Sequence, residues 1–239
     1  MPSEPPSGFF ANLIDLFFSP GDAFANMLSK PSFWVPLFLN LALSVAFTGI
    51  WLQKVDKIEF MKAQVEQSPR WDRVPVEQRA AILERQAAAV PAFSWGLALV
   101  FGPLFILIVS AVLLFVFRFF YASDVTFKQS LTIVSSAMVA VGLIATPLTL
   151  GVLAMKGDWN LNPGEALQAN LSLFLDKQTA AKPLWALASS LDLFMLWRVA
   201  LLTAGFAAAS KRRWLDALPG VAVPWVLTVA ISVAFSFFR

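Results

Sequence analysis

The chain has 239 residues, of which 58% are hydrophobic and only 14% are charged, and its mean hydropathy is +0.70. Soluble globular domains carry about 25% charged residues, so this composition excludes an ordinary soluble domain and predicts a membrane protein. The sequence has no Cys and no His, which excludes disulfides, zinc sites and imidazole bases. The net charge of +3 is too small and too scattered to indicate nucleic-acid binding.

Windows that are nearly free of charge, and long enough to cross the roughly 30 Å hydrocarbon core of a bilayer, define the predicted spans. These windows cover residues at about 32–53, 92–117, 129–155, 184–209 and 218–238. We therefore predict an all-α polytopic integral membrane protein, a five-helix transmembrane bundle over residues 31–239. Amphipathic interfacial helices over residues 1–30 precede the bundle, and a polar helical loop over 54–91 joins the first two spans.

The N-terminal segment has the pattern of an interfacial helix. In residues 8–18, Asn12 and Asp15 recur at helical spacing among Phe and Leu, and Ser19 extends this polar stripe. We expect the stripe to face water and the apolar side to face lipid; a protein-docking surface is the alternative. The opening MPSEPPSGFF has no basic region and no cleavage motif, so we expect no signal peptide.

Aromatic and apolar spacing gives further expectations for the first span and the polar loop. Trp34 and Trp51 lie roughly 25 Å apart along a helix, so we expect one indole ring at each membrane interface. In the loop 54–91, Ser68-Pro69 breaks a first helix and a second apolar row begins at Val76. We expect a helical hairpin that packs on the membrane or on the rest of the protein; a dimer contact is the alternative.

Asp192 and Arg198 are the ionisable residues inside a predicted span. Such residues are costly in a bilayer and by default indicate function. Their spacing puts them about 120° apart around a helix, so they cannot form an ordinary i,i+4 pair. In the structural interpretation, Asp192 lies near the membrane boundary and Arg198 reaches a neighbouring helix or snorkels. In the alternative, the two residues form a transport or substrate site.

Small and hydroxyl residues mark expected packing faces. In the fourth span, Ala204 with Ala208 and Gly205 with Ala209 follow the small-xxx-small pattern that lets another helix approach closely. Hydroxyls that could bond between helices lie in the third span, at Ser130, Thr132, Ser135 and Ser136.

Sequence signatures of catalysis are not found. An aspartyl intramembrane protease needs two membrane carboxylates, and the spans hold one. No His or Lys lies inside a span to activate a serine, and there is no phosphate-binding glycine loop. We therefore expect no enzyme activity, no catalytic, cofactor-binding or metal-binding residue, and no cofactor.

Four stretches carry a family resemblance. They are LFFSPGDAFANMLSKPSFWVPLFL, EQRAAILERQAAAVPAF, DVTFKQSLTIVSSAMV and SLDLFMLWRVALLTAGFAAASK. The last stretch is the most specific, because it is similar to the span-four signature "lDlFsiW…lL..G" of the Ypt-interacting-protein (Yip) domain family. With these stretches the chain resembles the bacterial branch of that family of five-span membrane proteins.

The resemblance implies a cytoplasmic N-terminus and an outward C-terminus, and it implies no catalytic residues. The raw count of Lys and Arg favours the opposite side as cytoplasmic, but the positive-inside effect is strongest for short segments beside the span ends. The two shortest loops, 118–128 and 211–216, favour the same orientation as the resemblance, and we expect a bacterial inner membrane. The Asp-Leu-Tyr-Gly-Pro signature of eukaryotic members is missing, so we do not expect the binding of small GTPases that those members are known for.

Two functions follow from these patterns. The first is a membrane-organising or adaptor scaffold, similar to trafficking proteins, whose partners are the lipid bilayer and a membrane protein or a second copy of the chain. The second is a small transporter, channel or lipid-moving protein that uses the Asp192/Arg198 region. A water-filled cavity reaching both residues would favour the second function, and a dry, close-packed bundle would favour the first.

Overall fold

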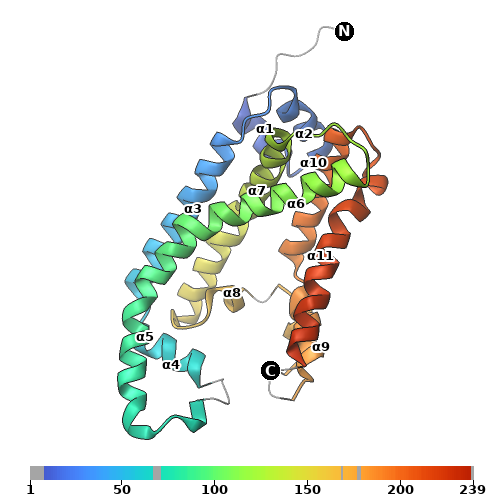
Figure 1. The fold of residues 1–239 in the computed structure, drawn as a ribbon. Coiled ribbons are helices and arrows are strands. Elements are labelled where there is room, and N and C mark those ends of the chain that lie inside the picture. The colour runs from blue at the N-terminus through green and yellow to red at the C-terminus, as the bar shows by residue number, and fades with distance from the viewer. Residues whose placement is uncertain (1–7, 67–70, 168, 177–178, 238–239) are drawn as a thin grey trace. The chain divides into compact units, whose positions relative to one another are not determined.

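A computed structural model describes residues 8–66, 71–167, 169–176 and 179–237 (Figure 1). The predicted break at Ser68-Pro69 and the end of the last predicted span lie outside these residues. In the described part, all secondary structure is helical apart from one isolated bridge. There, five helical segments are long and apolar enough to cross a membrane: Trp34–Lys54, Val76–Phe119, Phe127–Lys156, Leu193–Ser210 and Trp214–Ser236. The all-α polytopic prediction is confirmed.

The chain divides into two compact units. Unit 1 comprises Met1–Asn40, Phe105–Leu143 and Gln168–Arg239, and unit 2 comprises Leu41–Leu104 and Ile144–Leu167. Three long helices belong in part to each unit. They are α3 (Trp34–Lys54), α6 (Gly102–Phe119) and α7 (Phe127–Lys156).

The first half of α7 forms the centre of unit 1, where residues 131–137 are all buried. Ser130 Oγ donates to the Ser110 carbonyl of α6 at 2.7 Å. The amide nitrogen of Asn40, on α3, donates to the Ser135 carbonyl at 2.9 Å. Each bond joins two different helices, so each fixes the position of one helix against the next.

Three further α7 hydroxyls were predicted to bond between helices, and in the described residues they do not. Thr132 and Ser135 donate to carbonyls of their own helix, at Lys128 and Leu131. A hydroxyl on a helix reaches the carbonyl four residues earlier without any neighbouring helix, and this local bond prevails here. Ser136 Oγ is buried and has no hydrogen-bond partner among the described residues.

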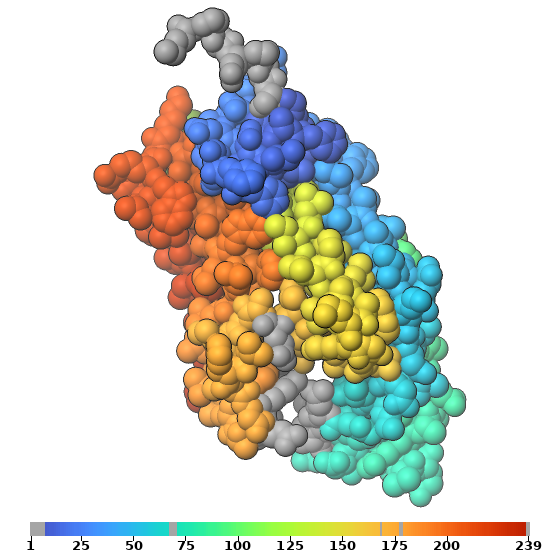
Figure 2. Space-filling model, turned by 180° about the vertical axis from the view of Figure 1, so that it is seen from behind, coloured from blue at the N-terminus to red at the C-terminus, as the bar shows by residue number. Residues whose placement is uncertain are grey.

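A short N-terminal layer covers part of unit 1. Helix α1 (Phe9–Asp15) packs on α2 (Pro20–Ser29), and α2 packs on α10 (Leu193–Ser210). Figure 2 shows this layer in blue against the orange α10. Pro20 suits the first turn of α2 because its fixed φ is helical and its missing N–H has no helical partner there. Helix α10 in turn packs on α11 (Trp214–Ser236).

The orientation predicted for α1 is wrong. Asn12 and Leu13 are buried, at 5% and 6% exposure, whereas Phe10 and Phe18 are 65% and 81% exposed. The helical period puts Asn12 on the same side as Leu13 and Leu16, and Leu16 is fully buried. The free energy gained by burying two leucine side chains exceeds the free energy that hydration of one amide would provide, so this rotation of the helix is favoured. The outward side of α1 is therefore aromatic rather than polar.

Unit 2 has a hydrophobic core of its own. Helix α4 (Lys57–Val65) packs on α5 (Val76–Gly96). The buried core residues are Trp51, Val55, Val90, Leu153 and Ala166. The Trp51 indole N–H donates to the Trp159 carbonyl at 3.1 Å, and the ring is only 5% exposed. Trp51 is thus a core residue rather than the interfacial anchor that we predicted, because the loop after α7 covers it.

The second span is the end of a much longer helix. The helical segment Val76–Phe119 has 44 residues and includes a π-helical turn at Leu97–Phe101. Pro103 follows that turn. Proline has no N–H, and its ring clashes with the carbonyl four residues earlier. Widening the turn relieves this clash and lets the helix continue.

Candidate functional site

The region predicted as one span over 184–209 forms two helices. Helix α9 (Lys182–Ser190) ends before Leu191, and α10 begins only at Leu193. Asp192, between them, has an extended backbone with φ −95° and ψ 138°. The single-span prediction is therefore wrong at its N-terminal part, because a side chain that caps a new helix interrupts the apolar run. Helix α9 packs against α11.

Asp192 is the N-cap of α10. Its Oδ1 accepts hydrogen bonds from the backbone N–H groups of Phe194 at 2.9 Å and Met195 at 3.1 Å. The Leu193 N–H donates to the Ala169 carbonyl at 2.9 Å, beside the Asn170–Asp192 bridge. The carboxylate thus satisfies helical donors that have no other partner, at the positive end of the helix dipole. This position explains a charge in an apolar stretch without a substrate.

Arg198 lies six residues after Asp192, about one and two-thirds turns along the helix, and does not pair directly with it. Its Nη1 contacts Met195 Sδ at 3.7 Å. Its Nε is buried and has no hydrogen-bond partner in the described part of the chain. The two residues share one end of α10, and Arg198 is the polar group there whose bonding is incomplete.

We expect Asp192→Ala to destabilise the protein by about 0.5–2 kcal/mol, because two N–H groups at the start of α10 lose their acceptor. Asp192→Asn should change the free energy of unfolding little, because the amide oxygen can accept the same bonds. Unfolding of both variants in mixed detergent micelles measures the difference. Equal losses in the two variants would show that the charge, rather than the cap, is what matters.

The predicted packing residues of α10 lie at different depths. Gly205 is buried against Ile133 of α7, so close that a Cβ at this position would overlap Ile133 Cγ2. Ala204 is buried as well, at 4% exposure, whereas Ala208 and Ala209 are half-buried at the end of the helix. The close approach of α7 therefore centres on Gly205.

An aromatic stack in unit 1 was not predicted from the sequence. The Phe117 ring lies between Phe206, at a centroid distance of 4.5 Å, and Tyr121, at 4.7 Å. Gly220 of α11 contacts two of these rings, Phe117 of α6 and Tyr121 of the loop that follows it. Arg212 closes the stack: its guanidinium lies 5.2 Å from the Tyr121 ring, and its Nη2 donates to the Tyr121 carbonyl. The i,i+4 spacing of Phe117 and Tyr121 was the available signal, but it does not reveal Phe206.

In the described residues, no group of three or more acidic side chains could hold a metal ion. This finding does not test the expectations of no metal and no cofactor, which stay predictions. The features that unit 1 does contain are a helix cap, a partly bonded arginine and close-packed aromatic and glycine contacts.

The fold defines the class: this is an integral membrane protein built from α-helices, with apolar segments that can cross the bilayer. The sequence profile of the Yip1 domain matches residues 14–235, nearly the whole chain, and the protein belongs to the Yip1 domain family. No curated protein matches the chain, and no solved structure does.

Proposed function

We propose that this protein is a non-enzymatic membrane-organising scaffold, a role that also suits an adaptor in membrane trafficking. The observation that carries the proposal is the outward side of residues 9–18, which comprise α1 and the turn that follows it. Phe10, Ile14 and Phe18 are 65%, 60% and 81% exposed and recur every four residues, while the opposite side is held on the bundle. A rigidly attached helix with this apolar side acts as a wedge at the membrane interface.

The apolar side chains of the wedge are large enough to anchor the segment in the membrane interface. Burial of each large apolar side chain contributes about 1.5–3 kcal/mol, so three such residues hold the segment firmly in the interfacial region. Because Phe17 contacts the Trp197 ring of α10 at a centroid distance of 5.4 Å, the inserted segment stays coupled to the bundle. Insertion into one leaflet then expands that leaflet and favours curvature.

The wedge can be tested in liposomes that contain the purified protein. We expect the wild type to reduce vesicle diameter or to form tubules, and the triple variant Phe10→Ser, Ile14→Ser, Phe18→Ser to lose this effect. Electron cryomicroscopy of the vesicles measures it. Ile58→Ser with Val76→Ser provides the control, because these residues are 46% and 72% exposed but lie outside residues 9–18. A triple variant that remodels vesicles as well as the wild type would refute the proposal.

Arg198 favours a second candidate function, a transporter or channel, because its buried Nε has no partner among the described residues. Against it, the Asp192 carboxylate is engaged as a helix cap. The same liposomes distinguish the two functions. A flux of solute or ions that is present in the wild type and lost in folded Asp192→Asn protein would favour transport.

The scaffold would sit in a bacterial inner membrane with its N-terminus in the cytoplasm. Arg118, Lys128 and the run 211–213 make the two short loops of unit 1 basic, and short basic loops stay on the cytoplasmic side. Reporter fusions at Met1 and Arg239 should give opposite signals, because an odd number of spans separates them. The same compartment at both ends would contradict this topology. A membrane protein or a second copy of the chain is the proposed partner.

A further inference from the structure

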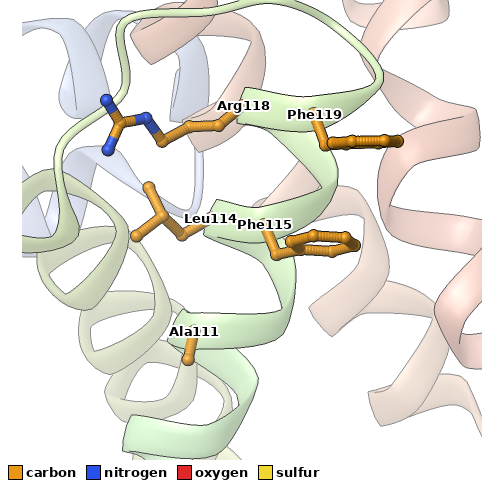
Figure 3. A pocket seen from close by; sticks show the side chains of 5 residues that line it. All are labelled: Ala111, Leu114, Phe115, Arg118 and Phe119. Atoms are coloured by element: carbon orange, nitrogen blue, oxygen red, sulfur yellow. The ribbon is translucent and has the colours of Figure 1, made fainter.

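Helix α6 carries a shallow hollow of about 400 Å³ on its surface. Five residues line it: Ala111, Leu114, Phe115, Arg118 and Phe119. Figure 3 shows how they are arranged: Leu114 and Arg118 project to one side of the helix, Phe115 and Phe119 to the other, and the small Ala111 lies below them. The hollow is thus a groove that runs along the helix between an aliphatic wall and an aromatic wall.

The walls of the groove are ordered by their own contacts. The Phe115 and Phe119 rings stack at a centroid distance of 5.4 Å with an interplanar angle of 13°. Apart from Arg118 the lining residues are apolar, which suits a hydrocarbon chain. Arg118 alone among the lining residues carries a charge, and it lies at the end of α6, where the chain leaves the apolar span.

Arg118 is exposed, and in the described part of the chain its guanidinium takes part in no hydrogen bond or ion pair. Other cations lie on the loops at the same end of unit 1. Arg212 is held there by its bond to the Tyr121 carbonyl at 2.8 Å. Arg213 is paired with Asp216 at 2.9 Å, and that hydrogen bond raises the pKa of Arg213. The end of the groove therefore holds a free guanidinium, and the Arg212 cation is bonded to the loop that begins three residues after it.

We propose that this groove binds one anionic phospholipid, with an acyl chain between the two walls and the phosphate on Arg118. The apolar walls explain the chain, and the charge complementarity at the mouth selects an acidic headgroup over a neutral one. A guanidinium can hold a phosphate through two parallel hydrogen bonds. The site goes beyond the proposed scaffold function, and it shares no residue with the outward side of α1.

Native mass spectrometry of the purified full-length protein tests the proposal. Micelles contain equal amounts of phosphatidylglycerol and phosphatidylcholine, and the ratio of the two lipids retained on the protein is measured. We expect the wild type to retain phosphatidylglycerol preferentially. Arg118→Gln should reduce this preference about fivefold, the usual effect of one basic residue near an anionic lipid surface. Arg118→Lys should keep part of the preference.

Two further variants separate the groove from general surface charge. Ala111→Phe fills the groove without changing charge, and it should reduce retention of phosphatidylglycerol while leaving Arg118 in place. Lys156→Gln removes an exposed cation from the end of α7 and should leave the preference unchanged. Helical circular dichroism and gel filtration establish that each variant is folded. Equal retention of both lipids by the wild type, or an unchanged preference in Arg118→Gln, would overturn the proposal.

Discussion

Phe117→Ala should be the most damaging single substitution in unit 1, with a loss of about 3–5 kcal/mol in the free energy of unfolding. The side chain is fully buried, and its ring is stacked on Phe206 and Tyr121. Truncation leaves a cavity where α6, α10 and α11 meet, and it removes two aromatic contacts as well. Unfolding of the purified protein by increasing denaturing detergent measures the loss.

The matched control for this substitution is Phe105→Ala. Phe105 lies on the same helix but is 53% exposed, so its truncation opens no cavity and should cost far less. Comparable losses for Phe105→Ala and Phe117→Ala would mean that the stack contributes nothing beyond the ordinary burial of a large side chain.

Gly205→Ala should destabilise the protein by about 1–3 kcal/mol, because it adds a methyl group to a contact that has no room for it. The new Cβ would overlap Ile133 Cγ2, and Ile133 is fully buried. A β-branched side chain on a helix has essentially one rotamer, so Ile133 cannot turn away and the two helices must separate. The usual gain from replacing a helical glycine by alanine, about 1 kcal/mol, is too small to compensate.

A double-mutant cycle makes the Gly205 prediction specific. Ile133→Ala removes both γ carbons that would meet the new methyl group, so Gly205→Ala should cost much less in that background than in the wild type. Gly151→Ala on α7 is the control, since nothing lies within 4 Å of a Cβ at that position, and it should be neutral or stabilising. Additive losses at Gly205 and Ile133 would contradict the contact.

Much of the fold could be predicted from composition. Apolar windows of sufficient length located the membrane-crossing helices, because the hydrocarbon core requires each crossing segment to satisfy its own backbone hydrogen bonds. The break at Asp192 could not be predicted in this way. The apolar residues on both sides of Asp192 predicted a single span. Only the two hydrogen bonds to its Oδ1 identify the residue as the cap of a shorter helix. For the candidate site, the sequence named Asp192 and Arg198 but not their bonding.

The sequence by itself therefore determined the membrane class, the all-α fold and the Yip1 family of this protein, because hydropathy and local motifs are properties of continuous segments. Only the tertiary structure determined which side of each segment is buried in the core and which side is exposed. Trp51 became a core residue because the chain near Trp159 returns to cover it. Asn12 turned inward because Leu13 and Leu16 on the same side are buried. Such outcomes depend on contacts between residues distant in sequence, and these override the preference of any single helix.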